Sequence, residues 1–225
     1  MRFEAVTARR AGLVGAWAVV AFWGLVVVAG LAQPGYRPSR DYVSALASEG
    51  ARWPVLGIVA LLSFGVAYLA AAVVLARGVG TAVAAGLLVG AGLLTWVVAF
   101  ARIHCPGGAA FCSVSAPDRG GQSVADTASR FGPHLHGWSV AASYALVAIA
   151  MLWLAVVLGR RGDRRRALAS VAALVTSLAT VPFWTGSDTP GGAQRVWLGI
   201  LSAWVLLICA IPLSVGAAIV EEERS

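Results

Sequence analysis

The chain has 225 residues, of which 59% are hydrophobic and only 12% are charged, and its formal net charge is +7. A soluble domain of this size needs far more polar surface, so the composition excludes a water-soluble fold and indicates a membrane bundle. The positive charge does not indicate nucleic-acid binding, because the basic residues lie in short connections between apolar runs, where they orient a membrane protein.

Six apolar runs are long enough to cross a bilayer, which takes about 20 mainly apolar residues per helix. We therefore predict an all-α membrane protein, a six-transmembrane-helix bundle that forms a single domain over residues 1–225. The predicted spans are 11–32, 54–76, 81–101, 138–158, 167–184 and 196–220, and the predicted outer loops are 33–53, 102–137 and 185–195.

Arginines predict the orientation of the bundle. Arg9 and Arg10 precede the first span, and the densest basic run, residues 160–166, follows the fourth. Because short cytoplasmic loops carry an excess of basic residues, we place both of these segments, and with them both termini, in the cytoplasm. The first apolar run reads as a retained span rather than a cleaved signal peptide. The predicted location is the bacterial cell membrane, where the protein is multi-pass.

Two local features follow in chain order. Residues 33–41 are rich in proline and glycine and end the first helix, and residues 42–48 then read as a short helix lying flat at the membrane interface. In the third span, Gly86 and Gly90 form a small-xxx-small pair that predicts close approach of another helix.

The interiors of the predicted spans contain no Asp, Glu, Lys, Arg or His. Proton and ion relays normally need such groups, so the sequence disfavours a proton-coupled transporter or pump. The polar groups there are hydroxyls, which we expect to bond between helices or to carbonyls of their own helix. They belong to Ser63, Tyr68, Thr95, Ser143, Tyr144, Thr176, Thr180 and Ser202.

Two cysteines and three histidines lie in the loop 102–137. We expect a disulfide between Cys105 and Cys112, because the predicted outer side is oxidising. The alternative is a metal pair that includes histidine ligands from His104, His134 and His136. Pro133 and Gly137 flank the last two histidines and favour an extended start of the fourth span, in which the two rings share a side. No metal or cofactor is assigned.

Arginine and aspartate side chains gather in the predicted outer loops, where charges are costly unless they are paired or in a wet cavity. We expect Arg40 and Arg195 to bind the anionic part of a ligand, with Asp41 and Asp118 orienting their guanidiniums through bidentate pairs. Arg130 belongs to the same cluster. The same residues could instead staple the loops together.

Three motifs carry a resemblance. They are Pro-Gly-Tyr-x-Pro-x-Arg-Asp-x-x-Ser-x-Leu over residues 34–46, an aspartate-containing loop with Asp118 that leads to His136-Gly137, and Gly-x-Gln-Arg at Gly192, Gln194 and Arg195. The chain resembles the bacterial six-pass membrane family known as a domain of unknown function, DUF998. This resemblance implies the six-helix fold and an outer cluster, and supplies no established activity. The implied cluster consists of Arg40, Asp41, Asp118, His136, Gln194 and Arg195.

Three functions remain open. The first is an outward-facing polar pocket that binds a lipid headgroup or a small amphiphile, with membrane lipids as the partners and no nucleic acid. The second is a membrane-embedded enzyme on lipid or isoprenoid substrates, in which His136 is the acid or base and Asp118 or Asp188 its partner. The third is a packing subunit of a larger complex. Oligomeric state does not follow from the sequence.

Overall fold

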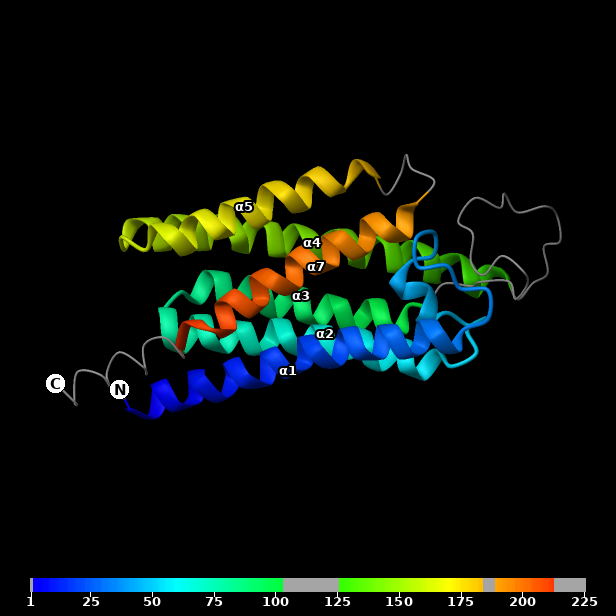
Figure 1. Ribbon diagram of the computed structural model, residues 1–225, viewed down its shortest axis with the longest axis horizontal. Helices are drawn as coiled ribbons and strands as arrows, with labels where there is room; N and C mark the ends of the chain where they lie inside the picture. The colour runs from blue at the N-terminus through cyan, green and yellow to red at the C-terminus, as the bar shows by residue number, and fades with distance from the viewer. Residues whose placement is uncertain (1, 103–125, 184–188, 213–225) are drawn as a thin grey trace.

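The computed structural model describes residues 2–102, 126–183 and 189–212, and helices make up most of that part of the chain. The elements are α1 (Arg2–Ala32), the 3-10 helix η1 (Val43–Ala47), α2 (Pro54–Val74), the π-helical turn η2 (Leu75–Val79), α3 (Ala82–Phe100), α4 (Asp126–Arg160), α5 (Arg164–Thr180) and α7 (Pro190–Cys209). Figure 1 shows the long helices lying side by side along one axis, with α1 beginning and α7 ending at the same end of the bundle.

Within these residues, five helices are long and apolar enough to cross a membrane. They are Glu4–Ala32, Pro54–Val79, Ala82–Phe100, His134–Arg160 and Pro190–Cys209. The remaining long helix, α5, has 17 residues and runs beside α4 (Figure 1). The prediction of a multi-pass, all-helical membrane protein is therefore confirmed, while the sixth span and the cytoplasmic termini stay predictions.

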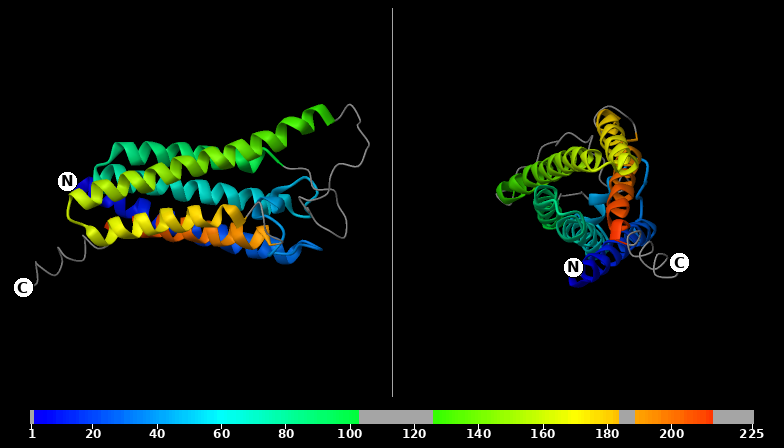
Figure 2. Two further views of the ribbon diagram at one scale, coloured as in Figure 1. Left: turned by 90° about the horizontal axis from the view of Figure 1, so that it is seen from above. Right: turned by 90° about the vertical axis from the view of Figure 1, so that its left-hand side faces the viewer.

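Seen from the end, the helices form a ring in the order α4, α3, α2, α1, α7, α5 (Figure 2). Several neighbours in the ring are joined by a side-chain hydrogen bond, as expected where lipid gives helices little hydrophobic reason to associate. These bonds are Trp23 Nε1 to Ser202 Oγ at 3.0 Å for α1 and α7, Trp204 Nε1 to Ser170 Oγ at 3.1 Å for α7 and α5, Tyr144 Oη with Ser177 Oγ at 3.1 Å for α4 and α5, and Ser143 Oγ to the carbonyl of Ala91 at 3.1 Å for α4 and α3.

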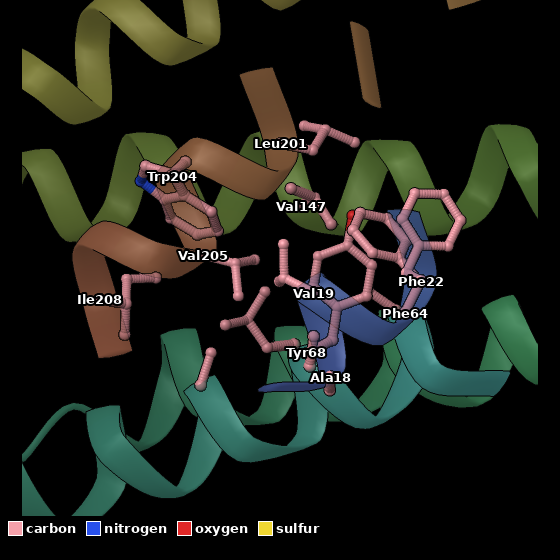
Figure 3. Packing of buried hydrophobic residues seen from close by; sticks show 14 of the residues in the cluster. Ala18, Val19, Phe22, Phe64, Tyr68, Val147, Leu201, Trp204, Val205 and Ile208 are labelled. Carbon is pink, nitrogen blue, oxygen red and sulfur yellow. The ribbon is translucent and has the colours of Figure 1, made fainter. Parts of the chain in front are cut away.

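An aromatic stack fills the centre of the ring. Phe22 of α1 stacks on Phe64 of α2 with ring centroids 4.6 Å apart, and Phe64 contacts Tyr68 at 4.9 Å. Figure 3 shows this stack facing Val147 of α4 and Leu201 of α7. All of these side chains are almost fully buried.

The hydroxyl prediction is confirmed for every predicted side chain except Tyr68. Besides the bonds between helices, Ser63, Thr176 and Thr180 each bond to a carbonyl of their own helix. Tyr68 is only 2% exposed, and no hydrogen bond to its hydroxyl is found within the described part of the chain.

Residues 42–48 differ from their predicted place. All five residues of η1 are buried, so this segment enters the end of the ring instead of lying flat at the interface. A buried backbone must find hydrogen-bond partners inside the protein. As described below, side chains from α7 and from Arg102, which follows α3, supply them.

The predicted extended start of the fourth span is wrong, because α4 is already helical from Asp126. Proline at 133 fixes φ near its helical value and removes only one N–H donor, so the helix continues through it. In a helix, residues two apart point to nearly opposite sides, so His134 and His136 do not share a side.

The last helix begins earlier than the predicted span. Pro190 stands at the first helical position, where its missing N–H is not needed, and α7 runs from there. Gln194 and Arg195 thus lie in the first turns of a helix rather than in the loop 185–195. Trp197, two turns inside α7, is 6% exposed.

Candidate functional site

Three of the predicted polar residues, Asp41, Gln194 and Arg195, meet where η1 enters the ring, a region we call the η1 end. It comprises residues 33–53, the first two turns of α7, and Arg102 after α3. Gly191, Gln194 and Arg195 are spaced i, i+3 and i+4 along α7, so they share one helical face. That face contacts the loop before η1.

Arg195 holds this loop through backbone carbonyls. Its Nη1 donates to the carbonyl oxygens of Asp41 and Gly191, both at 2.9 Å, and to that of Pro38. Its Nη2 donates to the hydroxyl of Tyr36, whose ring centroid lies 5.4 Å from the guanidinium carbon. In place of the predicted bidentate pair with the Asp41 carboxylate, Arg195 therefore ties the loop before η1 to the first turn of α7.

Three further residues of α7 strengthen the same contact. A Cβ at Gly191 would lie 2.4 Å from the carbonyl oxygen of Asp41, so only glycine allows this approach. Gly192 N donates to the carbonyl of Ser39 at 2.8 Å. Gln194 Oε1 accepts the N–H of Val43 at 2.7 Å, which satisfies the first buried donor of η1. The start of α7 is thus fastened to both the loop and η1.

Arg102 forms hydrogen bonds to the backbone at the other end of η1. Its Nε donates to the carbonyl of Ala47 at 3.0 Å and its Nη2 to that of Ser48 at 2.9 Å. The last carbonyls of a helical segment have no partners within it, and a cation there is also favoured by their dipoles. Sequence reasoning did not single out Arg102, although an arginine directly after an apolar helix was its available signal.

Asp41 points inward. It is 4% exposed, and its Oδ2 accepts the backbone N–H of Arg37 at 2.5 Å. Burial raises the pKa of Asp41, while that hydrogen bond and the guanidiniums of Arg195, Arg37 and Arg40 oppose the rise. The side chains of Arg37 and Arg40 themselves are exposed.

Replacement of Asp41 by asparagine tests this arrangement. Because its folded-state pKa is raised, the carboxyl group contributes stability that is complete below about pH 4, the unfolded pKa, and is lost as the pH rises through the folded pKa. The amide can still accept the Arg37 N–H without a charge. We expect wild type to gain thermal stability relative to Asp41→Asn as the pH falls from 7 to 4, measured by melting of the purified protein in detergent. A difference that is constant with pH would contradict the burial of a charged Asp41.

Tyr36 connects the arginine to the start of η1. Burial raises the pKa of Tyr36 to about 12 even though Arg195 lowers it, so the phenol keeps its proton at neutral pH. It therefore accepts from Arg195 and can donate to the carbonyl of Tyr42, 3.4 Å away. The loop is braced by a neutral hydroxyl and a cation together.

A cavity of about 60 Å³ lies directly beneath η1, between α2, α3, α4 and α7. The residues around it are Val43, Ser44, Leu61, Phe64, Tyr68, Thr95, Val98, Val140, Ser143, Gln194, Trp197 and Leu198. Its roof is therefore the segment that Gln194, Arg195 and Arg102 fasten in place.

The other predicted site residues are not brought into this cluster. His136 lies on α4, and its Nδ1 is 2.9 Å from the carbonyl oxygen of Ala101, so the ring joins α4 to the end of α3. Arg130 lies within α4, and its side chain is outside the description. The predicted disulfide Cys105–Cys112 and the predicted catalytic partners Asp118 and Asp188 all lie outside the described residues.

No three histidine, cysteine, aspartate or glutamate side chains come together as a metal site within residues 2–102, 126–183 and 189–212. Among the residues described, Cys209 is a free and buried thiol at the end of α7. The chemistry that these residues offer at the η1 end is thus hydrogen bonding and charge.

Comparison with known proteins agrees with the sequence motifs. The profile of the family described as Protein of unknown function (DUF998) matches residues 16–211. The chain belongs to the DUF998 family. The match covers the loop before η1 and the Gly-x-Gln-Arg motif of α7, so the contact between them lies inside the family region. No curated protein and no solved structure matches the chain. Family membership and the apolar helices identify an integral membrane protein.

Proposed function

We propose that this DUF998 protein binds the anionic headgroup of a membrane amphiphile at the η1 end, and that this end faces the outside of the cell. The observation that carries the proposal is the division of charge in the loop before η1. The carboxylate of Asp41 is turned inward onto backbone, whereas the guanidiniums of Arg37 and Arg40 are exposed. The loop therefore presents two cations close together on its surface.

Charge of this kind attracts anionic headgroups, and each basic residue near a lipid surface contributes about 1 kcal/mol. A guanidinium also matches a phosphate in geometry, because two of its N–H groups can bond to two oxygens. Arg40 and Arg37 are thus the residues proposed to contact the phosphate.

Rigidity of the loop supports the proposal as well. Binding costs less when the binding groups are already held in place. The backbone between Tyr36 and Asp41 is fixed by Arg195, by Gly192 N and by the turn bond from Arg40 N to the Arg37 carbonyl at 2.9 Å. In this proposal Arg195, Gln194 and Asp41 position the loop, and the exposed arginines contact the ligand.

Native mass spectrometry tests the proposal. Protein released from a mild detergent containing phosphatidylglycerol is expected to keep at least one such lipid, and the double variant Arg37→Gln/Arg40→Gln is expected to bind it about tenfold more weakly. About tenfold corresponds to roughly 1.4 kcal/mol, or two modest electrostatic contributions. The same experiment with native membranes would identify the lipid that the protein retains.

The matched control removes two exposed arginines from the opposite end of the bundle, as Arg164→Gln/Arg165→Gln. This variant has the same net charge as Arg37→Gln/Arg40→Gln and should retain the most tightly bound phosphatidylglycerol. An equal loss of phosphatidylglycerol from both double variants would contradict specific binding at the η1 end. So would a wild-type protein that retains phosphatidylcholine as well as it retains phosphatidylglycerol.

A further inference from the structure

We propose a second site: the cavity beneath η1 binds the hydroxyl-bearing end of a neutral, single-chain amphiphile, of the class of long-chain alcohols. This inference is independent of the exposed arginines and concerns the interior of the ring. It rests on the polar groups around the cavity, on the absence of charge among its lining residues, and on the apolar side chains that lie beside them.

The hydroxyl of Tyr68 is the first observation. Tyr68 lines the cavity and is 2% exposed, yet no hydrogen bond to its hydroxyl is found among the described residues, unlike all the other hydroxyls expected in the helices. Its ring is fixed by contact with Phe64 at 4.9 Å. A hydroxyl that faces a cavity and has no partner in the protein gains a hydrogen bond when a ligand oxygen enters.

Two other hydroxyls around the cavity, those of Thr95 and Ser143, can act as acceptors. Thr95 Oγ1 and Ser143 Oγ both donate to the carbonyl of Ala91, at 2.8 and 3.1 Å, which uses the only hydrogen on each hydroxyl. What remains on these two oxygens is the capacity to accept. They line the cavity and lie 3.3 Å from each other.

Gln194 adds donors at the roof. Its Oε1 accepts the N–H of Val43, so the group it can offer to a ligand is its NH₂. The cavity thus combines donors from Tyr68 and Gln194 with acceptors from Thr95 and Ser143. A hydroxyl group, which donates one hydrogen and accepts through two lone pairs, complements this set.

The absence of charge decides the ligand class. None of the lining residues carries a charge at neutral pH. Burying an unpaired carboxylate or ammonium is far more costly than burying a neutral polar group with hydrogen bonds. The cavity should therefore reject fatty acids and amines and accept neutral alcohols.

The size of the cavity leaves the chain of the ligand outside. About 60 Å³ has room for a small polar end, while an alkyl chain must pass between helices toward lipid. Leu61 of α2, Val140 of α4 and Leu198 of α7 line the cavity, so the alkyl chain would leave it past apolar side chains.

Photolabelling tests the site. The probe is a dodecanol that carries a diazirine near its hydroxyl, added to the purified protein in nanodiscs, with mass spectrometry of the labelled peptides. We expect saturable labelling of α2, α3, α4 and α7 segments around the cavity, competed by unlabelled dodecanol. The matched dodecanoic acid probe should label these segments at least about tenfold less, since an unpaired charge is excluded.

Two substitutions separate binding from folding. Tyr68→Phe removes the hydroxyl and keeps the ring, so it should weaken saturable labelling about fivefold while the unliganded protein melts at the same temperature or higher. Ser143→Phe fills the cavity and should abolish labelling. The control Tyr144→Phe removes a hydroxyl that bonds to Ser177 and does not line the cavity, and it should label as wild type does.

The proposal is overturned if labelling is not saturable, if the acid labels as strongly as the alcohol, or if Tyr68→Phe labels like wild type. Labelling that is not saturable would mean that the cavity holds water alone, which a polar space of this size can accommodate. Either of the other two results would mean that the lining groups do not select an alcohol. Arg37→Gln/Arg40→Gln should leave alcohol labelling unchanged, so failure of this site and failure of headgroup binding are distinguishable.

Discussion

Replacing Arg195 by alanine should lower the free energy of unfolding by about 3 kcal/mol and release the loop before η1. The substitution removes donors from the carbonyls of Pro38, Asp41 and Gly191 and from the Tyr36 hydroxyl. A hydrogen bond to a charged group contributes about 1.5–3 kcal/mol, and neighbouring bonds do not add fully. Thermal unfolding in detergent measures the loss. Trypsin measures the release, because the bond between the exposed Arg40 and Asp41 becomes cleavable when the loop opens, whereas Pro38 protects the bond after Arg37.

Arg195→Lys is the informative companion. Lysine keeps the charge, but a single ammonium cannot reproduce the planar set of donors that reaches Tyr36 and three carbonyls at once. We expect it to restore less than half of the lost stability. Arg52→Ala, which removes an exposed arginine from the same region, serves as the control and should change stability by under about 0.5 kcal/mol. If Arg195→Ala resisted trypsin as well as Arg52→Ala does, the role of Arg195 in holding the loop would be refuted.

Gly57→Ala should be nearly as damaging. A Cβ at this position of α2 would lie 2.4 Å from the carbonyl carbon and oxygen of Leu46 and 2.5 Å from the nitrogen of Ala47. These are backbone atoms of a segment held at both ends, so they cannot move aside cheaply. Overpacking of this kind costs about 1–3 kcal/mol and sometimes more, and we expect about 3 kcal/mol here. Thermal unfolding of the purified variant is the measurement.

The same substitution at Gly86 provides the control. Nothing lies within 4 Å of a Cβ built there, and Gly86 is in the middle of α3. Alanine in a helix interior is more favourable than glycine by roughly 0.5–1 kcal/mol, so Gly86→Ala should be neutral or slightly stabilising. Equal melting temperatures for the two variants would show that η1 does not pack against α2 as described.

These glycines also show where sequence patterns mislead. The pair Gly86 and Gly90 predicted close approach of helices, yet Gly86 faces open space and Gly90 meets only the side chain of Leu146. Tight backbone contacts are made instead by other glycines, among them Gly12, Gly57 and Gly191, which belong to no small-xxx-small pair that we identified. The small-xxx-small pattern shows that a close approach is sterically allowed. Whether another segment does approach depends on how the helices pack.

Only part of the candidate site could be predicted from the sequence. The motifs around Arg40 and Asp41 and around Gln194 and Arg195 were expected to meet, and they do, but the acceptors were taken to be carboxylates. Backbone carbonyls have no signature in a sequence, so the bonds from Arg195 to Pro38 and Asp41 and from Arg102 to Ala47 could not be read from it. The neutral cavity could not be predicted from the sequence either, because its lining residues come from five separate segments.

By itself the sequence determined that the chain is a multi-pass helical membrane protein with polar chemistry at the helix ends. Apolar length and the exclusion of charge are local properties that a bilayer enforces on each segment separately. The tertiary structure alone decided that η1 enters the ring, that Asp41 faces backbone, and that Tyr68 opens onto a cavity. Each of these depends on which buried donors and acceptors meet across the fold, and that pairing arises only when distant segments pack together.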